Sequence, residues 1–178
     1  MKYGVLKVVL AMAVYLCIDY IIRDAVFEWS LSAIKTFKRS HDLEWFFKYG
    51  HFFVSTVSYT LLLIGPLSVM DYSYVFIIVM AQGLGTTIFI FEKILIRAPR
   101  PFFVDPEIPI GFCKFAEFGS PSGHAFLAAV CYPVTAEMCL KYYKSTNQTR
   151  TLAYVLIVVP IIAYTGFSRI YDGMHSID

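Results

Sequence analysis

Charged side chains are scarce in this chain of 178 residues. They make up 16% of the sequence, while hydrophobic residues make up 58% and the mean hydropathy is +0.63. Soluble globular domains carry more charge than this, so the composition indicates an integral membrane protein. The net charge of +2 is small, and the basic residues form no stripe that could follow a nucleic-acid backbone. The composition therefore gives no support for nucleic acid as a partner.

Cysteine is also sparse, and the sequence has no Cys-x-x-Cys motif, no internal repeat and no low-complexity tract. Cys17, Cys131 and Cys139 lie in apolar stretches, where we expect reduced, packed thiols. Cys113 lies in a predicted loop without an obvious partner, so the redox compartment stays open. Acidic residues at positions 105, 107 and 117 are spaced too irregularly to support a metal site. The length suits a single membrane-embedded domain, residues 1–178.

Five apolar stretches are long enough to enter a bilayer as helices. They cover about residues 3–22, 52–70, 73–91, 122–140 and 152–167. The first contains Lys7 and Asp19, and a cleaved signal peptide is its alternative. The long apolar run without a convincing cleavage site favours a retained anchor. We therefore predict an all-α fold, an integral membrane bundle of about five transmembrane helices.

Three of the connections between these stretches have a distinctive composition. Residues 23–50 mix charges with tryptophan and phenylalanine, which is typical of one or two amphipathic helices at the membrane interface, with a break near residues 38–42. Residues 92–120 contain four prolines and no helical periodicity, so they predict a long loop of the kind that carries active-site residues. Residues 141–150 form a short, basic connection.

Three polar clusters, at residues 93–101, 121–124 and 168–175, interrupt the apolar sequence. Each cluster stands at the end of a predicted span. If the last three spans alternate in direction, all three clusters reach the same face of the membrane. They supply the cations Lys93, Arg100 and Arg169, the imidazoles of His124 and His175, and the helix-starting hydroxyl of Ser122.

This combination of side chains suits the binding and cleavage of a phosphate ester. Arg100 and Arg169 carry planar guanidinium groups that can pair with phosphate oxygens bidentately. Pro121-Ser122 predicts a helix start, whose outward-facing amides favour an anion, and Gly123 lets the backbone approach closely. Two imidazoles suit a nucleophile and an acid near neutral pH. The residues alone do not say which histidine does which.

The three clusters resemble the signature motifs of the type 2 phosphatidic acid phosphatase superfamily. That superfamily includes lipid phosphate phosphatases, polyprenyl diphosphate phosphatases and glucose-6-phosphatase, and it shares its site with vanadium haloperoxidases. The first motif is a lysine, six residues and Arg-Pro, which matches Lys93 and Arg100-Pro101. The second matches residues 121–124 in full, and the third matches Ser168, Arg169 and His175. The motif-bearing part of the chain is about residues 91–178.

The resemblance implies roles for these residues. His175 would be the nucleophile that forms a phosphohistidine, and His124 would protonate the leaving group. The phosphate would be held by Lys93, Arg100, Ser122, Gly123 and Arg169. The resemblance also implies no metal and no cofactor, sensitivity to vanadate, and a site on the luminal or extracytoplasmic face of a multi-pass membrane protein.

The third motif departs from the family at its end. The family has an aspartate four residues after the histidine, whereas Asp178 follows His175 by three. Both positions lie on the same face of a helix as the histidine, so Asp178 is a candidate for the group that orients the ring. The family also has a further span after this motif. We therefore expect the family core to be truncated at its C-terminus, as in a piece of a longer chain.

The sequence predicts a metal-independent membrane phosphatase for a phosphate monoester or diphosphate, with a phosphorylated lipid and the bilayer as its partners. A sugar-phosphate phosphatase similar to glucose-6-phosphatase is one alternative. A non-catalytic relative that binds anionic lipid or membrane partners is another, and the departure at Asp178 favours it modestly. The substrate, the membrane and the oligomeric state stay open.

Overall fold

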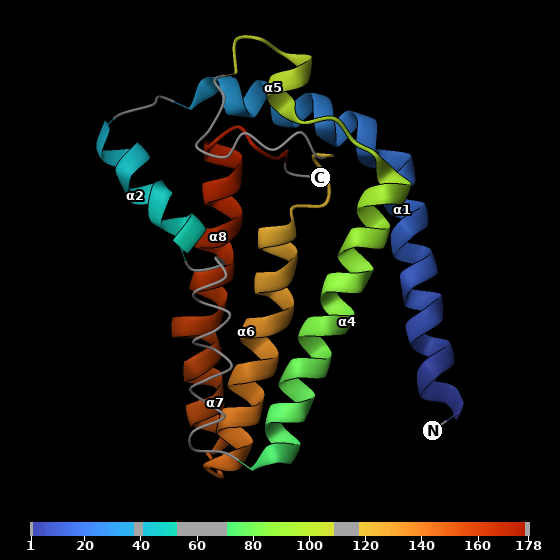
Figure 1. Ribbon diagram of the computed structural model, residues 1–178, viewed down its shortest axis with the longest axis vertical. Coiled ribbons are helices and arrows are strands. Elements are labelled where there is room, and N and C mark those ends of the chain that lie inside the picture. The colour runs from blue at the N-terminus through green and yellow to red at the C-terminus, as the bar shows by residue number, and fades with distance from the viewer. Residues whose placement is uncertain (1, 38–40, 53–70, 109–117, 177–178) are drawn as a thin grey trace.

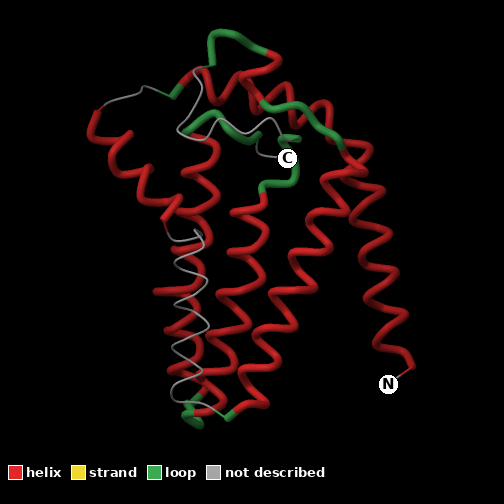
Figure 2. The backbone as a smooth tube through the Cα atoms, viewed as in Figure 1, coloured by secondary structure: helices red, strands yellow, loops and turns green. Residues whose placement is uncertain are grey.

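The computed structural model of the chain describes residues 2–37, 41–52, 71–108 and 118–176, and in these ranges every regular element is a helix (Figures 1 and 2). The predicted all-α fold is confirmed. In chain order the elements are α1 (Lys2–Thr36), α2 (His41–Phe52), α4 (Tyr72–Ile96), α5 (Pro101–Val104), α6 (Gly123–Tyr142), α7 (Asn147–Ala153), the π-helical turn η1 (Tyr154–Val158) and α8 (Val159–Tyr171).

Three helical segments of the described chain are long and apolar enough to cross a membrane. They are α4 with its short continuation into α5, α6, and the continuous rod from α7 through η1 to α8. In Figure 1 they run side by side, with α6 between the other two, and α6 packs against both. They match the predicted spans 73–91, 122–140 and 152–167. The predicted span 52–70 lies outside the described residues except for Phe52, which ends α2.

The first helix corrects a predicted boundary. We expected a span to end at residue 22 and interfacial helices to begin at Arg23, but α1 continues without interruption to Thr36. Arg23 pairs with Asp19 one turn earlier, so the charges that suggested a boundary neutralise each other along one helix. The predicted break near residues 38–42 agrees with the end of α1 and the start of α2 at His41. Figure 1 shows the second half of α1 turning over one end of the bundle.

Two predicted loops are shorter than expected because the helices beside them extend further. The helix α4 continues five residues past its predicted end at Phe91, to Ile96, so Lys93 lies in its last turn. The loop that follows contains the short helix α5. At the opposite end of the bundle, α6 continues to Tyr142 and α7 begins at Asn147, where Thr146 caps it by accepting from the Thr149 amide at 3.2 Å. Only residues 143–146 separate these two helices.

Small and apolar residues pack α4 against α6. Gly85 on α4 faces Val130 on α6 so closely that a Cβ at Gly85 would lie 3.2 Å from Val130 Cγ1. Farther along the same interface, a buried cluster forms from Val75, Ile78 and Met138. The rod accommodates Pro160, which has no N–H to donate, directly after the wider turn η1. The contacts of Gly85 and of the buried cluster fix α4 relative to α6.

Candidate active site

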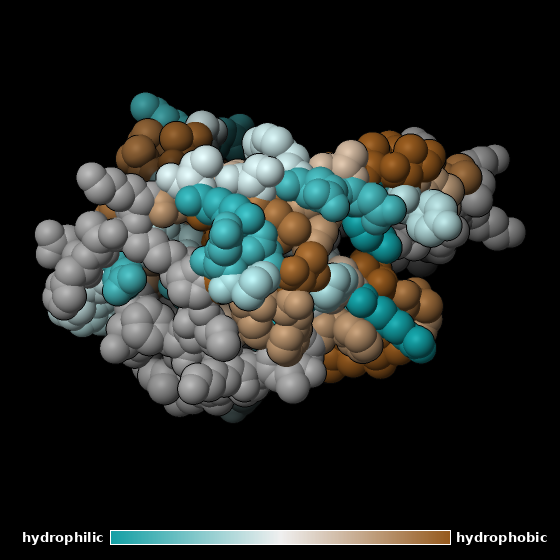
Figure 3. Space-filling view, turned by 90° about the horizontal axis from the view of Figure 1, so that it is seen from above, coloured by the Kyte–Doolittle hydropathy of each residue, from teal (hydrophilic) through white to brown (hydrophobic). Residues whose placement is uncertain are grey.

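The three polar clusters converge at one end of the bundle. The C-terminal ends of α4 and α8 and the N-terminal ends of α5 and α6 all lie toward the upper end in Figure 1, where the second half of α1 crosses the bundle. Seen from above in Figure 3, hydrophilic side chains gather over the middle of this end, with hydrophobic ones beside them. The predicted alternation of the last three spans therefore brings the motifs to the same end.

The end of α8 is shaped by a tight turn. Gly173 has a φ of 67°, a left-handed conformation that glycine adopts without strain, one residue beyond the C-cap Asp172. The amides of Met174 and His175 both donate back to the Arg169 carbonyl, at 3.2 and 3.3 Å. The turn therefore directs His175 back over the end of its own helix. Arg169 is 3% exposed and pairs with Asp172 at 3.7 Å.

Arg100 reaches the same turn from another part of the chain. It precedes α5 in extended backbone, and Pro101 at the first helical position fixes the direction in which the chain continues. The side chain of Arg100 is 2% exposed. Its Nη1 donates to the Met174 carbonyl at 3.0 Å and lies 3.5 Å from His175 Nε2. Two guanidinium groups, separated by 69 positions in the sequence, thus flank one imidazole.

The neighbours of His175 assign its tautomer. The ring Nδ1 donates to the carbonyl oxygen of Gly119, which can only accept, so Nδ1 carries the proton. On the other side of the ring, Arg100 Nη1 can only donate, so Nε2 presents its lone pair. A carbonyl oxygen therefore holds the ring at Nδ1. Asp178, the candidate for that role, lies outside the described residues, and Asp172 pairs with Arg169 instead.

The position of Gly119 leaves no room for a side chain. A Cβ at this residue would lie 2.5 Å from the Pro99 carbonyl oxygen and 3.1 Å from Arg100 Cα. The amide of Gly119 donates to the Ala98 carbonyl at 2.7 Å while its own carbonyl accepts from His175. Gly119 therefore connects the loop that carries Arg100 to the imidazole.

The environment of His175 keeps its ring neutral. Burial lowers the pKa of His175 well below its ordinary value of 6.5, and the positive charges of Arg169, Arg100 and Lys93 lower it further. The hydrogen bond to Gly119 opposes these effects without reversing them. A neutral imidazole, whose Nε2 carries a lone pair, is the form that can attack an electrophile.

The start of α6 forms one wall of a small cavity next to His175. Ser122 is the N-cap, as predicted, and its Oγ accepts from the Ala125 amide at 3.4 Å. The cavity has a volume of about 220 Å³, and α6, α8 and the turn after α8 enclose it. Its walls are formed by Pro121, Ser122, Ala125, Phe126, Gly166, Arg169, Ile170, His175 and Ser176. Positive charge, hydroxyl groups and a helix N-terminus meet here, so the cavity favours an anion.

The remaining predicted site residues lie around this cavity but not in its wall. Lys93 Nζ lies 5.7 Å from the centre of the Phe89 ring, on the last turn of α4. Gly123 begins α6, and a Cβ there would lie 2.9 Å from Phe89 Cε2. His124 follows in the first turn and is half-buried. Of the predicted site residues, the cavity wall thus contains Ser122, Arg169 and His175. Arg100 adjoins the cavity through His175. The surrounding helix ends carry Lys93, Gly123 and His124.

Comparison with known proteins identifies the family. A model of the PAP2 superfamily matches residues 71–178, which is more than half of the chain. The chain belongs to the PAP2 superfamily. Phosphatidylglycerophosphatase B of Bacillus subtilis is 35% identical over 60 residues, which are 34% of this chain and 29% of that protein. The alignment therefore spans less than a third of that curated relative.

A solved structure supports the fold. The crystal structure of a transmembrane PAP2-type phosphatidylglycerolphosphate phosphatase from Bacillus subtilis superposes with a TM-score of 0.76, covering 95% of this chain and 84% of the other, at 21% identity. At this identity the similarity shows the fold alone. The arrangement of α4, α6 and α8 is therefore that of an integral membrane PAP2 protein.

Two residues that lie at the cavity or beside His175 were not among the predicted site residues. Gly119 orients His175 through its backbone carbonyl, which no side-chain motif reveals. Ser176 lies in the cavity wall immediately after His175 and is 6% exposed. A polar residue next to a predicted nucleophile could have been noted, but its burial depends on the turn at Gly173.

Proposed function

We propose that the chain is a membrane phosphatase that cleaves a phosphate ester through a covalent intermediate on His175. The observation that carries the proposal is the tautomer of His175, with Nδ1–H held by Gly119 and the Nε2 lone pair directed toward Arg100. An imidazole in this state beside a small cationic cavity is prepared to attack phosphorus.

The proposed reaction has two displacements at phosphorus. In the first, His175 Nε2 forms a bond to phosphorus while the bond from phosphorus to the ester oxygen breaks, and His124 gives its proton to the departing alkoxide. In the second, water attacks the phosphohistidine, a proton passes to His124, and phosphate leaves as Nε2 recovers its lone pair. Arg100, Arg169 and Lys93 supply the positive charge that offsets the negative charge of the phosphoryl oxygens. The proposal therefore needs no metal ion.

We further propose that the substrate is a lipid phosphate. The site stands at the end of apolar helices, where a headgroup can reach the cavity while its chains stay in the bilayer. The names printed for the curated relative and for the solved structure refer to a phosphorylated phosphatidylglycerol and support this class of substrate. We place the site on the luminal or extracytoplasmic face, as the family resemblance implies.

A substrate panel tests the proposed function. The full chain, purified in detergent, would be given lipid phosphates, polyprenyl diphosphates and sugar phosphates, each with and without a metal chelator, and released phosphate would be measured. We expect lipid phosphates to be hydrolysed at the same rate with and without the chelator. Preference for sugar phosphates would overturn the proposed substrate, strict dependence on a divalent metal would overturn the mechanism, and no hydrolysis of any ester would indicate a non-catalytic protein.

The proposed orientation has its own test. Gln148 is exposed at the end of the bundle opposite the site, so Gln148→Cys introduces a thiol on the other membrane face. In sealed vesicles whose lumen corresponds to the extracytoplasmic side, a membrane-impermeant maleimide added outside should label the variant more than the parent chain. Equal labelling of both would contradict this orientation.

A further inference from the structure

We propose that Ser176 is an additional catalytic residue, whose Oγ–H donates a hydrogen bond to a non-bridging oxygen of the phosphoryl group that His175 attacks. The inference rests on the proposed function and adds a ligand to the same site. It is drawn from the residues of the cavity wall and not from the family motifs, because the match to the third motif ends at His175, one residue before Ser176.

The first observation is a buried hydroxyl that lacks a hydrogen bond. Ser176 is 6% exposed, and its Oγ has no hydrogen-bond partner among the residues that the structure describes. A hydroxyl removed from water without a partner destabilises the fold, which is why buried hydroxyls are nearly always paired. An exception at the edge of a cavity indicates a group that is paired when the cavity is filled.

The second observation concerns the residues that surround Ser176 in the cavity wall. It lines the cavity together with Ser122, Arg169 and His175, and no carboxylate is part of the described wall. A guanidinium group and hydroxyl donors around one hollow select an anion with several acceptor oxygens. The cavity volume of about 220 Å³ is smaller than the roughly 300 Å³ at which pockets for drug-sized ligands begin. It therefore suits a headgroup and not a whole lipid.

The third observation is how rigidly the backbone before Ser176 is held. The turn at Gly173 and the two amides that donate to the Arg169 carbonyl fix residues 173–175. The Met174 carbonyl is held in addition by Arg100. Ser176 follows directly on this anchored segment, next to the residue whose Nε2 would attack. The two side chains thus line one cavity from adjacent positions of a fixed turn.

The chain offers a matched control for Ser176. Thr135, in the middle of α6, is also buried, and within the described structure its Oγ1 likewise has no hydrogen-bond partner. Thr135 is not part of the wall of the cavity. Thr135→Val removes a buried hydroxyl, as Ser176→Ala does, but away from the cavity. A loss seen only in Ser176→Ala is therefore the loss of a ligand to the phosphoryl group, and not of a buried hydroxyl in general.

The experiment compares Ser176→Ala, Ser176→Thr and Thr135→Val in the full chain. The inhibition constant of orthovanadate, a phosphoryl mimic, and kcat/KM for a lipid phosphate would be measured for each, with thermal unfolding in detergent as the check on folding. For Ser176→Ala we expect both quantities to worsen by about tenfold or more, since a hydrogen bond to a charged group is lost. Ser176→Thr should recover most of the loss, and Thr135→Val should change neither quantity.

Each outcome decides the proposal. Unchanged orthovanadate inhibition and kcat/KM in Ser176→Ala, or an equal loss in Thr135→Val, would overturn it. If Ser176→Ala does not unfold cooperatively, Ser176→Cys keeps the side-chain volume while weakening the donor, and the same two expectations apply. If the parent chain hydrolyses no ester, the proposed function fails, and the role of Ser176 is then decided by whether Ser176→Ala weakens the protection that orthovanadate gives against thermal unfolding.

Discussion

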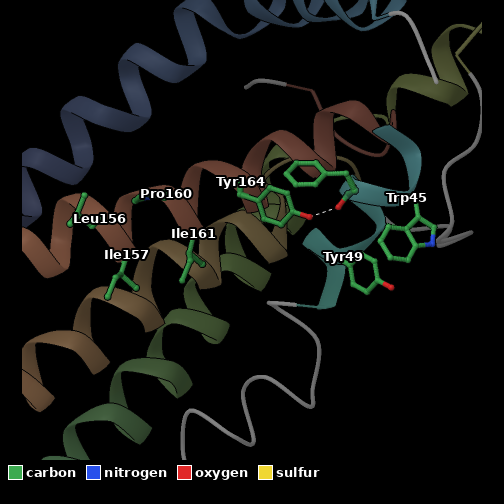
Figure 4. Close-up of a pocket in the computed structure, with 8 residues that line it drawn as sticks. Trp45, Tyr49, Leu156, Ile157, Pro160, Ile161 and Tyr164 are labelled. Atoms are coloured by element: carbon green, nitrogen blue, oxygen red, sulfur yellow. Dashed lines mark hydrogen bonds between the residues drawn. The ribbon is translucent and has the colours of Figure 1, made fainter. Parts of the chain in front are cut away.

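Two hollows lie along the same helix, and their chemistry is opposite. The larger, about 590 Å³, is an apolar groove between α2 and the η1–α8 rod (Figure 4). It is lined by Trp45, Phe46, Tyr49, Leu156, Ile157, Pro160, Ile161 and Tyr164. The smaller cavity, beyond the groove along α8, contains Arg169 and His175. A search for the active site by volume alone would favour the groove, but of the two hollows only the cavity has groups that can act on a phosphate.

Helix geometry explains why the two hollows do not merge. Successive residues on an α-helix are rotated by about 100°, since 3.6 residues make a turn. Pro160, Ile161 and Tyr164 therefore share one face of α8, whereas Arg169 lies on roughly the opposite one. The groove faces α2 and the cavity faces α6. The groove is thus a surface that contacts hydrocarbon or α2, and the cavity is the proposed reaction site. Substitutions in each hollow can test this difference.

The largest expected effect is the loss of the proposed nucleophile. His175→Ala should lower the turnover of a lipid phosphate by at least about a thousandfold, because the substitution removes the Nε2 lone pair that attacks phosphorus. Released phosphate measures the rate, and protection by orthovanadate against thermal unfolding measures whether the cavity persists. Normal turnover in this variant would assign the chemistry to another residue.

The second effect is a loss of activity when the planar guanidinium of Arg169 is replaced by an ammonium group. Arg169→Lys keeps the charge but removes the planar fork, so kcat/KM should fall by about ten- to a hundredfold. Arg150→Lys is the control, because Arg150 also pairs with a carboxylate, Glu137 at 3.1 Å, but at the far end of the bundle. Equal rates for the parent chain and Arg169→Lys would show that Arg169 does not hold the phosphoryl group.

The third effect is the pH dependence of stability that His175 contributes. The folded protein holds the pKa of His175 below 6.5, so below about pH 6.5 the unfolded chain binds a proton that the folded one does not. The stability contributed by the neutral ring is present above pH 6.5 and is lost as the pH falls. The melting temperature should therefore drop between pH 7 and pH 5, and drop less in His175→Ala. Formation of the phosphorylated enzyme should continue below pH 6.5, and its loss at that pH would contradict a lowered pKa.

The smallest effect is expected in the groove. The hydroxyl of Tyr164 donates to the Phe46 carbonyl and so ties α8 to α2. Tyr164→Phe should lower the free energy of unfolding by about 1 kcal/mol. It should leave kcat/KM unchanged within about a factor of two, because the two hollows are independent. A large loss of activity in Tyr164→Phe would mean that the groove takes part in catalysis after all.

The sequence predicted the parts of the fold that depend on composition and local pattern. Apolar length identified α4, α6 and α8, and Pro121-Ser122 identified the start of α6 because the cap is a local interaction. Alternation of the spans then placed Arg100 and Arg169 at one end. The boundary at Arg23 was wrong because the charge of Asp19 is neutralised one turn away, within the same helix.

Contacts between distant backbone atoms could not be predicted in this way. The carbonyl of Gly119 meets His175 across 56 positions, and any residue type carries a carbonyl, so the sequence gives no sign of it. The burial of Ser176 depends in the same way on the left-handed turn at Gly173 and on Arg100 reaching the Met174 carbonyl. Side-chain chemistry was therefore predictable, and the groups that orient it were not.

The end of α1 is joined to the loop that carries Arg100. Lys35 lies 2.5 Å from Asp105 and 3.0 Å from Glu107, and these bonds raise the pKa of Lys35 and lower that of Asp105. Leu31 and Ile34 pack on Ile108 beside them. Lys35 and Glu107 are exposed to water, so salt weakens these ion pairs, while the apolar packing of α1 is unaffected by screening. Higher ionic strength should therefore weaken the attachment of α1 to the loop that follows Arg100.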